Sequence, residues 1–145
     1  MAENNPQTNI KDGQAIATAA YAATNTPSTG QDSLGFSELL VSINVGTCVG
    51  AASGLIRLQE SSAVDGSGDA FATWTNSTFT ALTTSNHQKC VRGRVKLEGR
   101  KRYIRATLTY TGNGTTEVVP AGVTFLFLNP ADTAQYTPQT YDVNA

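Results

Sequence analysis

The clearest pattern along the chain is an alternation of apolar and polar residues with period two. Gly35–Gly46, GFSELLVSINVG, alternates around Phe36, Val41, Ile43 and Val45. Ser53–Ser61 alternates around Ile56 and Leu58. His87–Leu97 and Arg102–Tyr110 follow the same rule, and in Arg102–Tyr110 one face carries Ile104, Ala106, Leu108 and Tyr110. A period of two places these residues on one face of a half-buried β-strand, so the pattern predicts four strands here.

Further strands are expected where the alternation is weaker. Ala70–Thr75, which contains Trp74, and Ser77–Thr84 each predict a short strand. Ala121–Leu128 is apolar on both faces toward its end, which predicts a central strand that ends at Asn129-Pro130. In 14–24, Thr and Tyr favour an edge strand or an ordered arm over a helix. Segments 25–33 and 62–69 are rich in turn formers and predict loops.

These segments add up to about eight short strands separated by Gly and Asn turns, with no helix. That pattern is typical of an all-β sandwich, jelly roll or barrel. The length of 145 residues suits one domain. We therefore expect an N-terminal arm or edge segment at 1–30, a single domain of antiparallel strands with one of these architectures at 31–130, and a C-terminal tail or arm at 131–145.

Charge is scarce, and its total is close to zero. Charged residues make up 14% of the chain and the net charge is −1, so overall attraction to nucleic acid or to a membrane is not expected. Uncharged polar surface is cheaper to desolvate than ionic surface, which suits a protein that partners cover. No apolar stretch has the length of a membrane span, and the start MAENNPQTNIKDGQ does not resemble a secretory signal. We expect synthesis in a cytoplasm.

The residues that carry chemistry are few. His87 is the single histidine, and on a strand it would face away from Cys90. No GxSxG motif, phosphate-binding loop or zinc-ligand spacing occurs, and we expect neither an enzyme nor a cofactor or bound metal. The segment Asp65–Asp69, DGSGD, lacks the spacing of a calcium loop, and a hairpin turn is the favoured interpretation. Cys48 and Cys90 are expected as two buried thiols.

The basic residues are strongly clustered. The segment 89–105 holds eight of the ten: Lys89, Arg92, Arg94, Lys96, Arg100, Lys101, Arg102 and Arg105. On two adjacent strands and their turn they would form a basic ribbon. Three interpretations remain open: a solvated hairpin, a surface that docks on an acidic protein shell, and, less favoured, a nucleic-acid site. Nucleic-acid binding would need more aromatic residues than Tyr103 alone.

Several of these segments together resemble a known group of proteins. The pieces are Asn44–Gly46 ("NVG"), Leu58–Ser61 ("LQES"), Trp74, Arg102–Gly112 ("RYIRATLTYTG") and the apolar Val123–Leu128. Across 35–130 the chain resembles the small decoration, or cement, proteins of tailed-phage capsids, which are encoded beside the major capsid protein.

The resemblance implies a structural role on the virion. It implies a jelly-roll β-sandwich, assembly into a homo-dimer or homo-trimer, and the major capsid protein as partner. The protein would lie on the capsid exterior, made in the cytoplasm of a bacterial host, and would clamp neighbouring capsid subunits. The basic cluster would contact the shell, and the two chain ends would serve as arms.

An alternative function is a carbohydrate- or receptor-binding module on the virion surface. Jelly rolls bind glycans through exposed aromatic residues, for which Trp74, Tyr103, Tyr110 and Tyr136 are the candidates. The competing expectation for these candidates is a place in the core or in an interface, and we expect Trp74, together with Phe125, to be buried in the core.

Overall fold

The computed structural model describes residues 11–86 and 89–130. The predicted C-terminal arm, the first ten residues of the predicted N-terminal arm, His87 and Tyr136 lie outside the described residues. Within them the protein is all-β, and no helix is present. The strands are β1 (Lys11–Tyr21), β2 (Gln31–Asp32), β3 (Phe36–Val45), β4 (Ser53–Ser61), β5 (Ala72–Thr78), β6 (Cys90–Lys96), β7 (Tyr103–Thr111) and β8 (Val119–Pro130).

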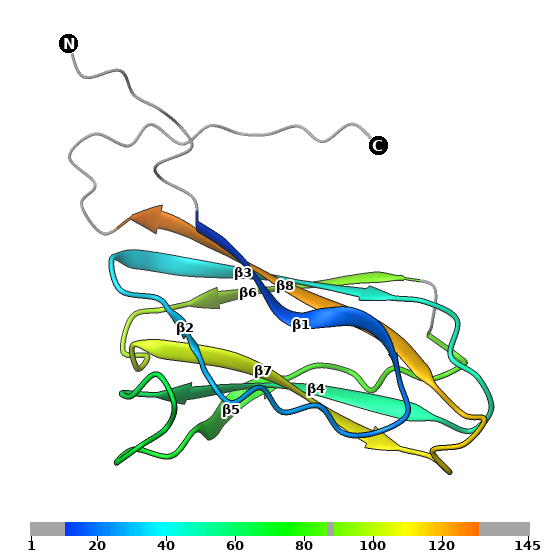
Figure 1. The fold of residues 1–145 in the computed structure, drawn as a ribbon. Coiled ribbons are helices and arrows are strands. Elements are labelled where there is room, and N and C mark those ends of the chain that lie inside the picture. The colour runs from blue at the N-terminus through cyan, green and yellow to red at the C-terminus, as the bar shows by residue number, and fades with distance from the viewer. Residues whose placement is uncertain (1–10, 87–88, 131–145) are drawn as a thin grey trace, which may run out of the picture.

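Two antiparallel sheets face each other and form a β-sandwich (Figure 1). The upper sheet in Figure 1 has the strand order β1-β8-β3-β6, and the lower sheet has the order β2-β7-β4-β5. Most consecutive strands lie in opposite sheets, so their connections cross at the ends of the sandwich. The exception is β4 and β5, which are neighbours in the lower sheet.

The core fills the space between the sheets, and it comes from the residues that the alternation placed inward. Ile56 and Leu58 of β4 are buried, as predicted, and so are Val41 and Ile43 of β3. Strand β8 lies between β1 and β3, which confirms the predicted central strand. Its inward side chains are the buried residues Val119, Ala121, Val123, Phe125 and Phe127.

Three strand predictions need correction. Ala70–Thr75 and Ser77–Thr84 are not two strands: β5 runs through Asn76, which adopts a φ of 64° beside a shift in the register with β4. A bulge of this kind accommodates a residue that would otherwise end the strand. Strand β8 ends at Pro130, opposite Phe36, as predicted, but it begins at Val119, two residues before the predicted start at Ala121. The short β2 lies inside the predicted loop 25–33.

Gly93, at the centre of β6, allows the ring of Phe79, the residue that follows β5, to approach the strand closely. A Cβ added at Gly93 would lie 2.5 Å from Cε1 of Phe79, so the ring packs directly on the glycine. The sequence suggested a bulge or a close contact at this position. The register of β6 with β3 is unbroken through Gly93, which leaves the close contact as the reason for glycine.

Candidate functional site

The basic cluster is divided between the two sheets, so the predicted basic ribbon is wrong. Strand β6 is the edge of the upper sheet, whereas β7 lies between β2 and β4 in the lower sheet. The segment 97–102 between them crosses from one sheet to the other instead of forming a hairpin turn. The cluster therefore splits into three groups with different surroundings.

The crossing segment is held by three ion pairs, which we call the ion-pair clamp. Arg102 Nη2 lies 2.7 Å from Asp32 Oδ2, Lys101 Nζ lies 2.7 Å from Asp69 Oδ1, and Arg100 Nη1 lies 3.5 Å from Glu60 Oε1. The Arg102 pair is bidentate, since Nε also donates to Asp32 Oδ1 at 3.0 Å. Each acid comes from a different part of the chain, so the clamp ties β2, β4 and the β4–β5 loop to one end of the sandwich.

Arg105 is also committed to internal contacts. Its Nε donates to Gln59 Oε1 at 2.9 Å and its Nη1 donates to the carbonyl of Pro27 at 2.6 Å. Its guanidinium lies 4.0 Å from the centre of the Phe71 ring, a cation–π distance. Arg105 therefore fastens the loop before β2 to the outside of the lower sheet.

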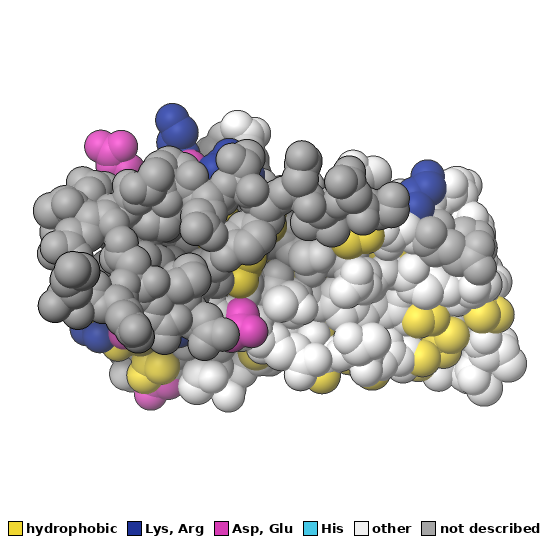
Figure 2. All heavy atoms as spheres, turned by 90° about the horizontal axis from the view of Figure 1, so that it is seen from above, with side chains coloured by type: hydrophobic (Ala, Val, Ile, Leu, Met, Phe, Trp, Pro, Cys, Tyr) yellow, Lys and Arg dark blue, Asp and Glu magenta, His cyan; other side chains and the backbone are white. Residues whose placement is uncertain are grey.

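The third group lies on β6 and immediately before it, and we call Lys89, Arg92 and Lys96 the β6 strip: Arg92 and Lys96 are exposed on the strand, and Lys89 precedes it. All three are exposed, and none forms an ion pair with another described residue. Arg94 lies between Arg92 and Lys96 on the same face of β6 but is paired, with Nη2 2.6 Å from Glu38 Oε2. Its side chain is still 66% exposed. Figure 2, which looks down on the upper sheet, shows Lys and Arg side chains along the upper edge of the view.

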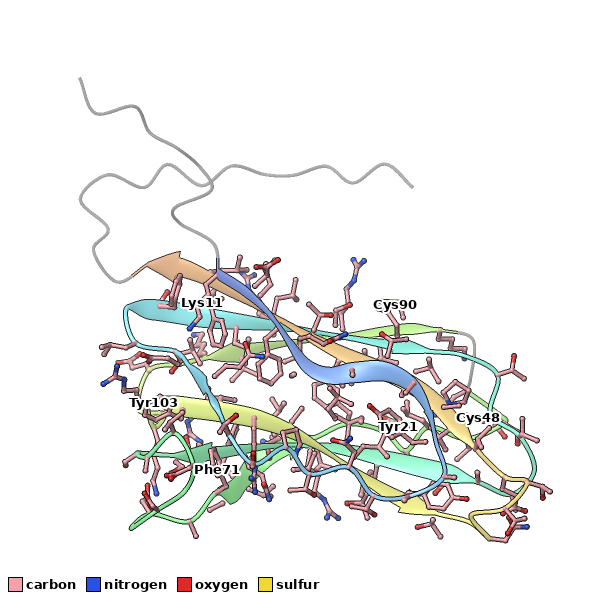
Figure 3. The ribbon with its side chains drawn as sticks, viewed as in Figure 1. Lys11, Tyr21, Cys48, Phe71, Cys90 and Tyr103 are labelled. Carbon is pink, nitrogen blue, oxygen red and sulfur yellow. The ribbon has the colours of Figure 1, made fainter. Side chains whose placement is uncertain are left out.

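Both cysteines are thiols, but only one is buried as predicted. Cys48 is buried, and burial raises the pKa of its thiol. Cys90 is exposed and points outward from the upper sheet (Figure 3). Its hydrogen bond with Ser42 (Sγ to Oγ, 3.4 Å), and then Arg92, hold the pKa of the Cys90 thiol below its ordinary value. Cys90 shares the parity of Arg92 and Arg94 along the strand, a signal that could have placed it outward from the sequence.

A shallow groove of about 530 Å³ lies beside this end of β6. Lys89 and Cys90 form one side, Thr18 lies on the bulged β1, and Asn44 and Pro120 come from β3 and β8. Of the aromatic residues proposed for glycan binding, the three that the structure describes, Trp74, Tyr103 and Tyr110, do not line it. The groove is continuous with the β6 strip, because Lys89 belongs to both.

The described aromatic candidates are dispersed and engaged internally. Trp74 is half-buried, with Arg100 5.2 Å from its ring, so its predicted place in the core is only partly realised. Tyr110 Oη donates to the carbonyl of Glu117 at 2.8 Å. The guanidinium carbon of Arg102 lies 5.1 Å from the centre of the Tyr103 ring. These three side chains do not meet in one platform that could stack on a sugar.

The acidic glycine loop closes on itself and on the clamp. Asp65 Oδ1 accepts from the backbone N–H of Ser67 at 2.9 Å. The carboxylate of Asp69 accepts from Lys101 and from the backbone N–H of Ser62. Across 11–86 and 89–130 no three His, Cys, Asp or Glu side chains are grouped as a metal site would need.

The clamp predicts a loss of stability in acid. The hydrogen bond from Arg102 holds the pKa of Asp32 at about 2, and the one from Lys101 holds the pKa of Asp69 at about 2. An unfolded Asp has a pKa of about 3.9. The stabilisation is therefore complete above about pH 4 and is lost as the pH falls through about 2. The urea concentration at the midpoint of unfolding should therefore decrease as the pH is lowered from about 4 to about 2. It should decrease less steeply in a variant that carries Asp32→Asn and Asp69→Asn. Equal slopes would contradict the role of the clamp.

Comparison with known proteins adds no assignment to this geometry. No family model matches the chain, and no curated protein matches it. In the part of the chain that the structure describes, no helix is long and apolar enough to cross a lipid bilayer.

Proposed function

We propose that this protein is a structural virion protein that binds the outside of a phage capsid and stabilises contacts between major capsid protein subunits. The observation that carries the proposal is the β6 strip. The fold neutralises Arg94, Arg100, Lys101 and Arg102 with its own acids. It leaves Arg92 and Lys96 exposed on one face of β6, with the exposed Lys89 just before the strand. Exposed cations that form no ion pair with another described residue are suited to an acidic protein surface.

The finer fold supports this proposal. We propose that the sandwich is a jelly roll, because the orders β1-β8-β3-β6 and β2-β7-β4-β5 interleave the first and last strands as two nested Greek keys do. Such a sandwich is a rigid body that can present one sheet edge to a shell. Assembly as a homo-dimer or homo-trimer, with the contact on the capsid exterior, belongs to the same proposal. No step of it requires catalysis.

Co-sedimentation with capsids tests the function. Heads of the encoding phage, assembled without this protein, are expected to bind the purified chain saturably and at a fixed ratio to the major capsid protein. Heads that already carry their full complement are the control and should take up no more. Binding should weaken as salt rises, because the contacting cations are exposed. Absence of saturable binding would reject the proposal, and a glycan array would then test the carbohydrate-binding alternative.

A further inference from the structure

The four outer edges of the two sheets differ in how well they could pair with another strand. Native proteins interrupt exposed edges, because an unbroken edge recruits other chains. Strand β1 has two register shifts, β2 has two residues, and β5 is bulged at Asn76. Three of the four edges are therefore shortened or distorted.

Strand β6 is the exception. It pairs with β3 from Glu38↔Lys96 to Asn44↔Cys90 without a register shift, and it contains no proline. Within 11–86 and 89–130 it pairs with no other strand. Its far side is thus a regular strand edge of seven residues.

The hydrogen bonds at the two ends of β6 identify which backbone groups face outward. Val45 N–H donates to the carbonyl of Lys89 at 3.0 Å, and Leu97 N–H donates to the carbonyl of Ser37 at 2.9 Å. In an antiparallel pair the bonding residues alternate, so 89, 91, 93, 95 and 97 bond toward β3. The N–H and C=O groups of Cys90, Arg92, Arg94 and Lys96 therefore point toward the open edge.

The charges of these residues determine what could occupy the edge. A second copy of β6, paired antiparallel, would bring cations opposite cations, which is destabilising. A nucleic acid has no alternating row of N–H and C=O groups to pair with the backbone. An extended protein segment with acidic side chains at alternate positions satisfies both the backbone and the charges.

We propose that β6 is a docking edge that takes an added, acidic β-strand from another protein. The incoming strand pairs with the outward N–H and C=O groups of Cys90, Arg92, Arg94 and Lys96. Its acidic side chains lie against the cations on the outer face. The inference rests on the proposed function for the source of that strand, which is the major capsid protein.

A matched pair of variants separates strand addition from simple charge attraction. Arg92→Thr removes the charge but keeps the outward N–H, whereas Arg92→Pro removes both. Proline is tolerated on an edge strand where the N–H faces away from the sheet. Heads should bind Arg92→Pro about tenfold more weakly than Arg92→Thr, since the proline variant loses a backbone bond and its ring blocks the edge. Thermal unfolding of both variants checks that they are folded.

Hydrogen exchange on the unmodified chain gives a second measurement that needs no variant. In the free protein the amides of Val91, Gly93 and Val95 should exchange slowly, and those of Arg92, Arg94 and Lys96 quickly. Strand addition should slow the second set on the heads. The same change should follow addition of a blocked, alternating Thr-Glu peptide, and should be absent with the matched Thr-Lys peptide.

The outcomes separate the two proposals. If heads bind both Arg92 variants alike and the outward amides stay fast, strand addition is overturned while the capsid function stands. If heads bind nothing, the capsid function fails. The peptide then decides: slowed outward amides support the acidic-strand edge, and unchanged amides overturn it. If Arg92→Pro instead dissociates an oligomer of the free protein, a second copy occupies the edge and the proposal is overturned.

Discussion

Replacing Phe125 with alanine is expected to lower the free energy of unfolding by about 3–5 kcal/mol. Phe125 is fully buried on the central strand β8, and its ring packs edge-on against Phe127 with centroids 6.1 Å apart. Alanine would leave a cavity between the two sheets that the neighbouring strands cannot close. Because a domain of this size has a total stability of about 5–15 kcal/mol, the variant should be close to unfolding at 37 °C.

Two substitutions calibrate this expectation in urea denaturation. Thr124→Ala, one residue earlier on the exposed face of β8, should change the unfolding free energy by no more than about 0.5 kcal/mol. Trp74→Ala should cost less than Phe125→Ala, since the Trp74 side chain is only half-buried. A Phe125→Ala midpoint equal to that of Thr124→Ala would show that the described core is wrong.

Reversing the charges of the β6 strip is expected to weaken capsid binding by at least about tenfold while the fold is retained, because like charges at an interface cost several kcal/mol. The variant carries Lys89→Glu, Arg92→Glu and Lys96→Glu, at three exposed positions without internal ion pairs among the described residues. Arg94 is left intact because it pairs with Glu38, whose side chain is only 19% exposed. Occupancy on heads at physiological salt measures the effect, and thermal unfolding checks the fold.

The ion-pair clamp supplies a control with the same change in charge. Arg100→Glu, Lys101→Glu and Arg102→Glu would set three glutamates against Glu60, Asp69 and Asp32. This variant should unfold at a lower temperature, because it replaces three attractive contacts with repulsive ones. Normal head occupancy of the β6-strip variant would reject the strip as the contact surface.

The amino-acid sequence by itself determined the all-β class, most of the strands and the inward faces of β3, β4 and β7. Period-two alternation is a local property, and it survives folding wherever one face of a strand is buried. The distribution of charge along the sequence located the basic cluster, and the apolar residues on both faces of Ala121–Leu128 predicted the central position of β8. Alternation predicted strands less well where turn formers and apolar residues are mixed. Examples are Asn76, which lies inside β5, and the two-residue β2.

Only the tertiary structure decided which basic residues are available to a partner. Neighbours in sequence at 92–105 are separated because β6 and β7 join different sheets. The acids that neutralise Arg100, Lys101 and Arg102 come from positions 60, 69 and 32, and no local pattern brings them together. Charge pairing depends on distances of a few ångströms across the fold, whereas alternation along a strand does not. For that reason the sequence predicted one basic ribbon, and the structure contains a neutralised clamp and an exposed β6 strip.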